Sequence, residues 1–548
     1  MNNTNTLYKL KSSYKTIIFI FTILFSISSN SQVAQEWVNR FNGTGNSEDL
    51  SRKVLVDEKS GDVYVTGRSY NLNGNQDIVT IKYNSAGNQK WIRTYNGIFG
   101  ADDPLDMVFD NSGSIIITGI TQGRNSGLDC VTLKYDSFGS LLWTKKYNGT
   151  ANGNDYGWSV CIDTKNDVII SGKSKGRDIV TGTHTLDDII TIKYTSQGIE
   201  KWVQRYNDGD NLNDGSFSIL TDQNDDIYVI GYSGSQANYD DIITIKYTSQ
   251  GALKWIKKHE TAEIDIGYKN LINQQVKEIY SLGRSGAANI ILCYDYSGVL
   301  KWHSTDIGAF NSFSSAAIDT RGKITVCGST SLYGTTDYMV RAYDPVTHGG
   351  LIWYDVYNGI GSGYDYPNIV IADRLDNVYV TGKSAGLSGL GSEYTTIKYD
   401  RSGVRLWEIR YSDAAAGENI PLSIAADYTG NVYVTGISMG SATGNFDYAV
   451  VKYSQATQPK SPADILPSEF SLSQNYPNPF NPVTVIKFSI PHRSNVRITV
   501  YNLNGQAIKE IINGSIEPGS HEIIFDGSSL SSGTYFCKME TDGYTEVK

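Results

Sequence analysis

Residues 78–91 read IVTIKYNSAGNQKW, and residues 242–255 read IITIKYTSQGALKW. In both stretches a run rich in β-branched residues ends in tyrosine, a glycine follows four residues later, and a tryptophan lies four residues beyond the glycine. Runs of this composition are typical of β-strands, and a short polar segment with glycine is typical of a tight turn. Each stretch therefore predicts a β-hairpin.

The hairpin belongs to a unit of about 52 residues that occurs eight times. Each unit carries a tryptophan, a glycine in the turn before it and, in seven of the eight units, an acid six residues before the tyrosine. An acid at the same place in nearly every unit is best explained as structural, because a catalytic group repeated so often would be redundant. The residues taken to define the repeat include Trp37, Trp91, Trp143, Trp202, Trp255, Trp302, Trp353, Trp407, Gly87, Gly139, Asp77 and Asp129.

Four strand-sized segments in each unit are typical of a β-propeller blade. A short turn cannot cross from the outer strand of one blade to the inner strand of the next, so we expect each blade to end after its tryptophan strand. The strand around Trp37 then stands alone, and we expect it to complete the last blade, which ends at Tyr453 without a tryptophan strand. Residues 33–453 thus predict an eight-bladed propeller closed by the N-terminal strand.

A seven-bladed ring stays open as the alternative. Units five and six are irregular, with Asn273, Ala288 and Asp306 in place of the usual aspartate, acid and aromatic residue. In either case the fold class is all-β.

The overall charge bears on the partners of the chain. The 548 residues carry a formal net charge of −10 at pH 7, and the sequence shows no cluster of lysine and arginine. A nucleic-acid partner is therefore not expected, because neutralising phosphates requires clustered basic side chains.

The N-terminal residues 1–31 have the pattern of a signal peptide. Lys9, Lys11 and Lys15 precede an apolar run over residues 17–27, and small polar residues follow it. This run is too short to cross a bilayer, which needs about 20 apolar residues in a helix. We expect removal of the segment near Ser31, export of the chain, and no transmembrane segment in the product.

A second domain is predicted after a polar linker over residues 454–466. Eight of the twelve prolines lie between Pro459 and Pro518, so the composition changes at this point. Residues 467–548 contain alternating strand patterns separated by turns such as Asn504-Gly505. This pattern predicts a small antiparallel sandwich of the immunoglobulin-like kind.

The second domain also carries a specific motif. Residues 475–482 read NYPNPFNP, and Val500-Tyr501-Asn502, Phe525-Asp526 and Ser532-Gly533-Thr534-Tyr535 follow. The block resembles the C-terminal sorting domain of type IX secretion substrates, the Por secretion tail. The resemblance implies that the secretion machinery is a partner, that the protein is secreted or held at the outer cell surface of a Gram-negative bacterium, and that the sorting signal includes Asn475, Tyr476, Pro477, Asn478, Pro479 and Phe480.

The eight units resemble a bacterial propeller repeat that is usually seven-bladed. Their Gly-x-x-x-Trp turn is also similar to that of quinoprotein propellers, which would imply a quinone-dependent dehydrogenase. No adjacent cysteine pair or cofactor motif accompanies the turn, so we predict no cofactor.

The candidate binding residues lie in the long connections, which strand alternation places on one face of the propeller. These loops are rich in Asp, Asn, Gly and Tyr, and aromatic side chains offer a large contact area at low entropic cost. A calcium ion is the one metal that such oxygen-rich loops could hold, but the spacing matches no known site, and no metal is predicted. The candidate ligand-binding residues are Asp155, Tyr156, Trp158, Asp210, Asp214, Tyr239, Asp240, Tyr364 and Tyr366.

No catalytic constellation is visible in the sequence. Gly-x-Ser-x-Gly occurs at Gly172, Gly382 and Gly436, always at the same repeat position and without the helix that a nucleophile elbow requires. The sequence therefore favours a non-catalytic binding or adhesion module for a glycan or protein. A polysaccharide hydrolase or lyase and a scaffold of a surface assembly stay open as alternatives.

Overall fold

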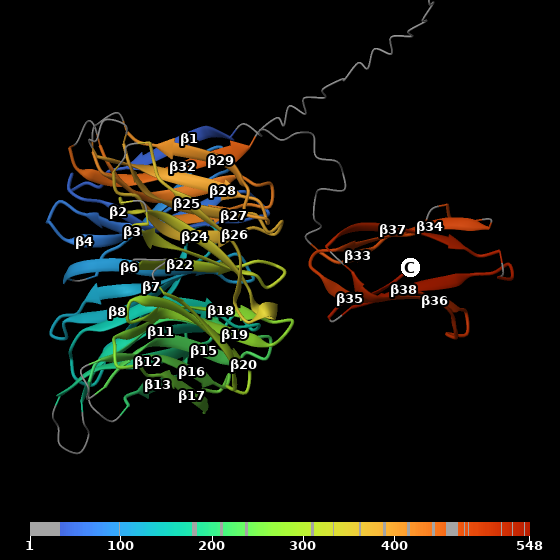
Figure 1. Ribbon diagram of the computed structural model, residues 1–548, viewed down its shortest axis with the longest axis horizontal. Coiled ribbons are helices and arrows are strands. Elements are labelled where there is room, and N and C mark those ends of the chain that lie inside the picture. Colours follow the sequence, from blue (N-terminus) through green and yellow to red (C-terminus); the bar gives the residue numbers. More distant parts are fainter. Residues whose placement is uncertain are drawn as a thin grey trace, which may run out of the picture.

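The computed structural model describes residues 33–97, 99–177, 184–208, 212–235, 239–307, 312–332, 334–360, 363–386, 391–413, 417–440, 444–455, 469–475, 477–480, 482–516, 518–528, 530–541 and 543–548. The expected signal peptide and all but the first two residues of the expected linker lie outside these ranges. Figure 1 shows an all-β chain with two folded parts, the propeller and a smaller sandwich.

The propeller contains eight blades of four strands, and within each blade neighbouring strands pair antiparallel. Six blades are separate sheets, and one parallel pairing, of Gln76 with Ala101, joins blades 1 and 2 into a continuous sheet. The strands of each blade are given from the innermost to the outermost. The first four blades are blade 1, β2 (Leu50–Val56), β3 (Val63–Tyr70), β4 (Gln76–Tyr83) and β5 (Gln89–Tyr95); blade 2, β6 (Phe99–Phe109), β7 (Ile115–Gln122), β8 (Leu128–Tyr135) and β9 (Leu141–Tyr147); blade 3, β10 (Asp155–Ile162), β11 (Val168–Arg177), β12 (His184–Tyr194) and β13 (Glu200–Tyr206); and blade 4, β14 (Asp214–Thr221), β15 (Ile227–Gly234), β16 (Asp240–Tyr247) and β17 (Leu253–His259).

The last four blades are blade 5, β18 (Asp265–Asn273), β19 (Glu278–Ser285), β20 (Ala288–Asp295) and β21 (Leu300–Ile307); blade 6, β22 (Ser312–Ile318), β23 (Ile324–Thr330), β24 (Asp337–Asp344) and β25 (Gly350–Tyr357); blade 7, β26 (Tyr366–Ala372), β27 (Val378–Ala385), β28 (Ser392–Tyr399) and β29 (Arg405–Tyr411); and blade 8, β30 (Asn419–Ala426), β31 (Val432–Met439), β32 (Phe446–Gln455) and β1 (Val33–Phe41). A single 3-10 turn, η1 (Pro345–Thr347), fills the one tyrosine-to-tryptophan connection that is longer than the others.

The inner strands form a closed ring, because each contacts the inner strands of the blades before and after it, and β30 contacts β2. The ring is closed by β1, which pairs antiparallel with β32 from Val33 opposite Gln455 to Phe41 opposite Tyr448. Figure 1 shows these two strands side by side although they come from opposite ends of the propeller sequence. The predicted blade boundary, the eight-bladed ring and the closing strand are confirmed, and units five and six both form complete blades.

The hydrophobic core lies between neighbouring blades. Val54, Val65 and Ile81 of blade 1, for example, pack with Tyr433 and Val450 of blade 8. The alternation of side chains along each strand gives every blade two apolar faces, and each face is buried against a neighbour. Ring closure therefore buries the last two faces, which an open array would leave exposed.

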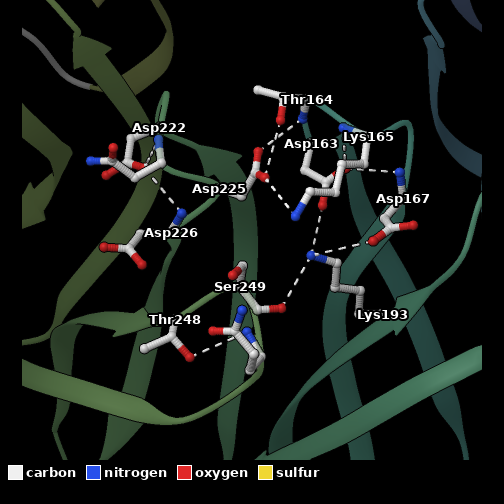
Figure 2. A network of polar contacts seen from close by, with 12 residues as sticks. Asp163, Thr164, Lys165, Asp167, Lys193, Asp222, Asp225, Asp226, Thr248 and Ser249 are labelled. Carbon is white, nitrogen blue, oxygen red and sulfur yellow. Dashed lines mark hydrogen bonds and ion pairs between the residues drawn. The ribbon is translucent and has the colours of Figure 1, made fainter.

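The blades are also joined at the short turns, which lie at the end of the propeller where the inner strands finish. Figure 2 shows the joint between blades 3 and 4. The ammonium group of Lys193 lies 2.7 Å from Asp163 Oδ2 and donates to the carbonyl of Ser249 in blade 4 at 3.1 Å. The backbone N–H of Thr164 donates to Asp225 Oδ1 of blade 4 at 2.9 Å. The buried ion pair of Lys193 and Asp163 thus lies within blade 3, and hydrogen bonds between charged side chains and backbone groups cross the joint to blade 4, as a low-dielectric interior requires.

The smaller domain is a sandwich of two sheets. One sheet contains β33 (Ser471–Leu472), β34 (Val483–Ile490) and β37 (Gly519–Asp526), and the other contains β35 (Ser494–Asn502), β36 (Ala507–Ile516), β38 (Tyr535–Glu540) and β39 (Thr545–Val547). Alternate residues of both sheets, such as Ile486, Phe488 and Ile498, form one core. The predicted antiparallel sandwich is confirmed.

Candidate ligand-binding surface

The two ends of the propeller differ in their connections. The turns between the first and second strands and between the third and fourth strands are short, and we call their end the short-turn face. The connections between the second and third strands and between successive blades form the opposite end, the long-loop face. Each inner strand begins at the long-loop face, so its first residues lie where the axis of the ring opens onto that face.

Every inner strand has a β-bulge near its start. The pairing with the second strand shifts by one residue, which leaves one residue unpaired and re-aims its side chain. The bulge residues of blades 1 to 8 are Arg52, Leu105, Trp158, Phe217, Tyr268, Ser314, Asn368 and Leu422. The bulge is therefore common to all blades, but its side chain is aromatic only in the three consecutive blades 3, 4 and 5.

The aromatic bulge residues belong to a continuous row that crosses four blades. Tyr156 and Trp158 stack with ring centroids 5.6 Å apart and an interplanar angle of 9°. The centroid of Trp158 lies 6.1 Å from Phe217, and Phe217 lies 5.8 Å from Tyr268. Tyr268 in turn stacks on Phe313 of blade 6 at 5.6 Å. These five partly exposed side chains, together with Tyr232, which lies 5.6 Å from Phe217, are here called the axial aromatic row.

Basic side chains lie next to the aromatic residues. The ammonium group of Lys173 lies 5.2 Å from the ring centroid of Tyr156 and 2.6 Å from Asp187. In blade 7, Lys383 lies 5.3 Å from the ring of Tyr366. Cations over aromatic faces are attracted by the quadrupole of the ring, so both tyrosines are held in place.

The candidate residues in the loops are placed differently from one another. Tyr156 and Trp158 belong to the axial aromatic row, whereas Tyr364 and Tyr366 form a separate stacked pair in blade 7 with centroids 6.4 Å apart. Tyr364 is 67% exposed and Tyr239 is 39% exposed, so both rings are available to a ligand. Asp240 opens β16 and is partly exposed, and Asp210 lies outside the described residues.

Two other candidates, Asp155 and Asp214, are fully buried beneath the loops. Asp155 Oδ2 accepts from the backbone N–H of Gly149 at 2.8 Å, so it fixes the connection that leads into its own blade. Burial, with a contribution from Asp129, raises the pKa of Asp155 to about 6. Burial, with the nearby Asp208, raises the pKa of Asp214 to about 7. A carboxyl group in such a place holds the loop rather than meeting a ligand in solution.

The residues of the repeat occupy equivalent places in the blades. Trp91 Nε1 donates to the carbonyl of Ser137 in the next blade, and a Cβ added to Gly139 would lie 2.9 Å from the Trp91 ring. Trp143 and Trp202 make the same bond to Ser196 and Ser249, and Trp255 bonds to Tyr296. The tryptophans thus fix each blade to the turn of the next one, and glycine is required where the indole lies flat on that turn.

Five of the seven repeated acids at the start of the third strand, those other than Asp129 and Asp241, accept hydrogen bonds from side chains. Asp77 accepts from Asn71 Nδ2 at 3.0 Å, and Asp188 forms an ion pair with Arg205 at 2.9 Å. Arg205 also donates to Ser174, the central serine of one Gly-x-Ser-x-Gly segment. Serine and acid at this position are therefore engaged in loop structure. Among the described residues, no group of three or more His, Cys, Asp or Glu side chains converges on a metal-sized site.

Comparisons with known proteins address the two domains separately. Residues 474–548 match the family described as the secretion system C-terminal sorting domain. The sorting motif thus lies in a domain of that family, which indicates type IX secretion and a secreted or cell-surface protein. Within the described residues, no helix is long and apolar enough to cross a membrane.

The propeller resembles solved propellers in fold alone. It is similar to the Dos1 propeller, at 11% identity and a TM-score of 0.50, over 77% of this chain and 95% of that one. It is also similar to Sqt1 from Chaetomium thermophilum, at 9% identity and a TM-score of 0.49, over 78% of this chain and all of that one. In sequence, an uncharacterized WD repeat-containing protein of Acanthamoeba polyphaga mimivirus is 23% identical over 221 residues, which are 37% of this chain. The match spans only 13% of the viral protein.

Sequence reasoning missed four members of the axial aromatic row: Phe217, Tyr232, Tyr268 and Phe313. A signal for two of them was present, because Trp158, Phe217 and Tyr268 each lie three residues after the aspartate that opens the inner strand. Trp158 was also the one tryptophan outside the repeat series, which marks it as a residue with a different role.

Proposed function

We propose that this protein is a secreted or surface-displayed carbohydrate-binding module, and that the axial aromatic row is its binding surface. The observation that carries the proposal is the continuous contact of aromatic rings from Tyr156 to Phe313 at the long-loop face. Core packing accounts for only one end of the row: Phe313 packs against the core between blades 5 and 6, whereas the other rings belong to no core cluster of the described residues and are partly exposed.

The chemistry of the row favours a sugar over a purely apolar ligand. An aromatic ring has a negative face, and the C–H bonds on one side of a pyranose ring present a weakly positive apolar surface that packs on it. The row is bordered by lysine, arginine and aspartate side chains that can hydrogen-bond to hydroxyl groups. A pattern of rigid apolar contacts with a few polar groups is typical of ligand-binding sites in general.

The sorting domain supports the location that this function requires. Type IX secretion brings the propeller to the outer surface of a Gram-negative cell, where polysaccharides are the abundant ligands. The secretion machinery would recognise the C-terminal domain, while the propeller meets the ligand.

A glycan array probed with the full-length chain tests the proposal. Trp158→Ala and Tyr268→Ala are each expected to weaken binding at least tenfold, since central aromatic side chains supply much of the energy of such contacts. Tyr428→Ala is the matched control, because Tyr428 is a 52% exposed tyrosine on the short-turn face. Circular dichroism and the melting temperature would show whether each variant is folded.

Two results would overturn the proposal. One is binding that both axial variants leave unchanged while Tyr428→Ala reduces it. The other is release of new reducing ends from a bound polysaccharide, which would make the protein an enzyme and direct the search to exposed carboxylates such as Asp240.

A further inference from the structure

Seven basic residues lie on the inner strands or beside them, three within the inner strands and four directly after the repeated glycine of the second strand, although the chain as a whole is acidic. Four acids neutralise five of them: Asp103 pairs with Arg52 and Arg68, Asp106 with Lys53, Asp187 with Lys173, and Glu418 with Lys383. The remaining two, Lys269 and Arg284, both belong to blade 5 and form no ion pair with any described residue. The excess positive charge of the surface is therefore concentrated in one blade.

Lys269 directly follows the aromatic bulge residue Tyr268 and has an exposed side chain. The inner strands around it nevertheless desolvate its ammonium group in part, and this, together with the charge of Lys53, lowers the pKa of Lys269. Asp106 has the opposite effect on the pKa. Lys53 and Asp106 come from the inner strands of blades 1 and 2, on the other side of the ring from blade 5. Lys53 and Asp106 are 2.9 Å apart and form an ion pair with each other, whereas Lys269 forms none with a described residue.

Arg284 lies on the second strand of the same blade, opposite Ile266 of the inner strand. The residues at this position in other blades turn toward the inner strands: Arg68 reaches Asp103, Lys173 lies over Tyr156, and Tyr232 contacts Phe217. The Nε of Arg284 is buried and has no hydrogen-bond partner among the described residues. A guanidinium group carries five N–H donors in a fixed, planar arrangement that suits a carboxylate or sulfate, and those of its terminal nitrogens are the ones that a ligand would meet.

We propose that the ligand of the axial aromatic row is an acidic polysaccharide, with an anionic group of one sugar bound by Lys269 and Arg284 and the sugar rings packed on the aromatic residues. This inference rests on the proposed function and adds the charge of the ligand. A net charge of −10 disfavours general adhesion to polyanions, so a local pair of cations selects ligands that also offer rings for the aromatic row.

The test compares ligands that differ only in charge. Binding of the full-length chain would be measured by calorimetry with polygalacturonate, with its methyl ester, with dextran sulfate and with dextran. We expect at least tenfold tighter binding of one acidic polymer than of its neutral counterpart, and binding that weakens as salt is added. The pair that shows the difference identifies the anionic group as carboxylate or sulfate.

The double variant Lys269→Gln and Arg284→Gln should bind the acidic polymer as weakly as wild type binds the neutral one. The double variant Lys59→Gln and Lys165→Gln is the matched control, because it removes two exposed lysines of the short-turn face. Equal loss in both double variants would overturn the inference, since it would indicate only a general effect of charge.

The results separate the two proposals. If a neutral polymer binds as tightly as its acidic counterpart and Trp158→Ala abolishes both, the carbohydrate-binding function stands and the acidic ligand is wrong. If no polysaccharide on the array or in the calorimeter binds, both are wrong. An acidic protein that binds while acidic polysaccharides do not would also overturn the inference.

Discussion

The short-turn face and the long-loop face are built from the same eight repeats, but they use them in opposite ways. At the short-turn face a lysine at the equivalent position of five blades donates to a backbone carbonyl of the next blade. The pairs of lysine and carbonyl are Lys82 and Ser137, Lys134 and Ser196, Lys193 and Ser249, Lys246 and Tyr296, and Lys452 and Ser85. At the long-loop face the bulge residue has almost no repeated identity. Constant residues therefore hold the ring together, and the variable position is where a ligand can be distinguished.

The carboxyl groups follow the same division. At the short-turn face burial raises the pKa of Asp110, but the Lys134 ammonium and the hydroxyl and amide groups of the turn lower it further, so the net change is downward. Hydrogen bonds within its turn likewise outweigh burial at Asp136 and lower its pKa. At the long-loop face burial dominates and raises the pKa of Asp49, Asp102 and Asp214. Ion pairs occur at both faces, but the carboxyl groups with a raised pKa lie mainly at the long-loop face; Asp319 of the short-turn face is an exception, because burial and the charge of Asp376 raise its pKa.

The largest expected effect concerns the joints. Lys193→Met should destabilise the propeller by about 3–5 kcal/mol, because it leaves the buried carboxylate of Asp163 without its counterion. The measurement is the shift of the denaturant midpoint in urea. Lys254→Met, at a lysine whose side chain is 48% exposed and 3.9 Å from Asp226, is the control and should cost less than about 1 kcal/mol. Equal shifts in the two variants would contradict the role of the joint lysines.

A smaller effect is expected where tryptophan lies on glycine. Gly139 and Gly113 both have positive φ, 83° and 80°, but only at Gly139 would a Cβ meet an indole ring. Gly113→Ala should cost about 1–2 kcal/mol for the left-handed backbone alone. Gly139→Ala should cost about 1–3 kcal/mol more, since the Trp91 ring must also move. The difference in melting temperature between the two variants isolates the tryptophan contact, and no difference would show that the contact is loose.

The last prediction concerns the pH dependence of stability and not its size at one pH. Because Asp214 binds a proton more tightly in the folded state, its contribution to stability is complete at low pH and is lost as the pH rises from about 4 to about 7. Asp214→Asn should remove this loss and raise the melting temperature at pH 8, and Asn419 shows that asparagine fits the equivalent place in blade 8.

Asp136→Asn is the control from the opposite face. The lowered pKa of Asp136 gives stability that is present near neutral pH and is lost as the pH falls, so this variant should lose stability mainly near neutral pH. Melting temperatures measured from about pH 2 to pH 8 would show the two opposite slopes, that of Asp136 below about pH 4 and that of Asp214 between about pH 4 and pH 7. Parallel curves would contradict the division between the faces.

The architecture could be predicted from the sequence because each repeat unit shows its four strands, its turns and its boundary. The interval between Tyr83, Gly87 and Trp91 defines a hairpin, and the unpaired strand around Trp37 leaves one way to close the ring. The irregular unit that contains Asn273 and Ala288 still forms a blade, since its strands keep their apolar faces.

The binding surface was only partly predictable. Loop composition was enough to predict Tyr156 and Trp158 as candidates. Their alignment with Phe217 and Tyr268, however, depends on a bulge that shifts the strand register by one residue, and no residue type in the sequence indicates where such a bulge occurs. Asp155 and Asp214 have the composition of loop acids, yet the connections fold over them. Burial of this kind depends on contacts between distant residues, which spacing along the chain does not reveal.

The antiparallel pairing of β1 with β32 also decides how the propeller carries mechanical load. Val33 and Gln455 are partners, so both ends of the propeller leave from the same point of the rim. Tension between those ends would separate the two strands one hydrogen bond at a time, beginning at that pair, because the bonds lie perpendicular to the strands. Tension on the C-terminal side alone enters β32, which is bonded on both sides by β31 and β1. A propeller held through its sorting domain would thus be pulled by a strand inside a sheet and not by its edge.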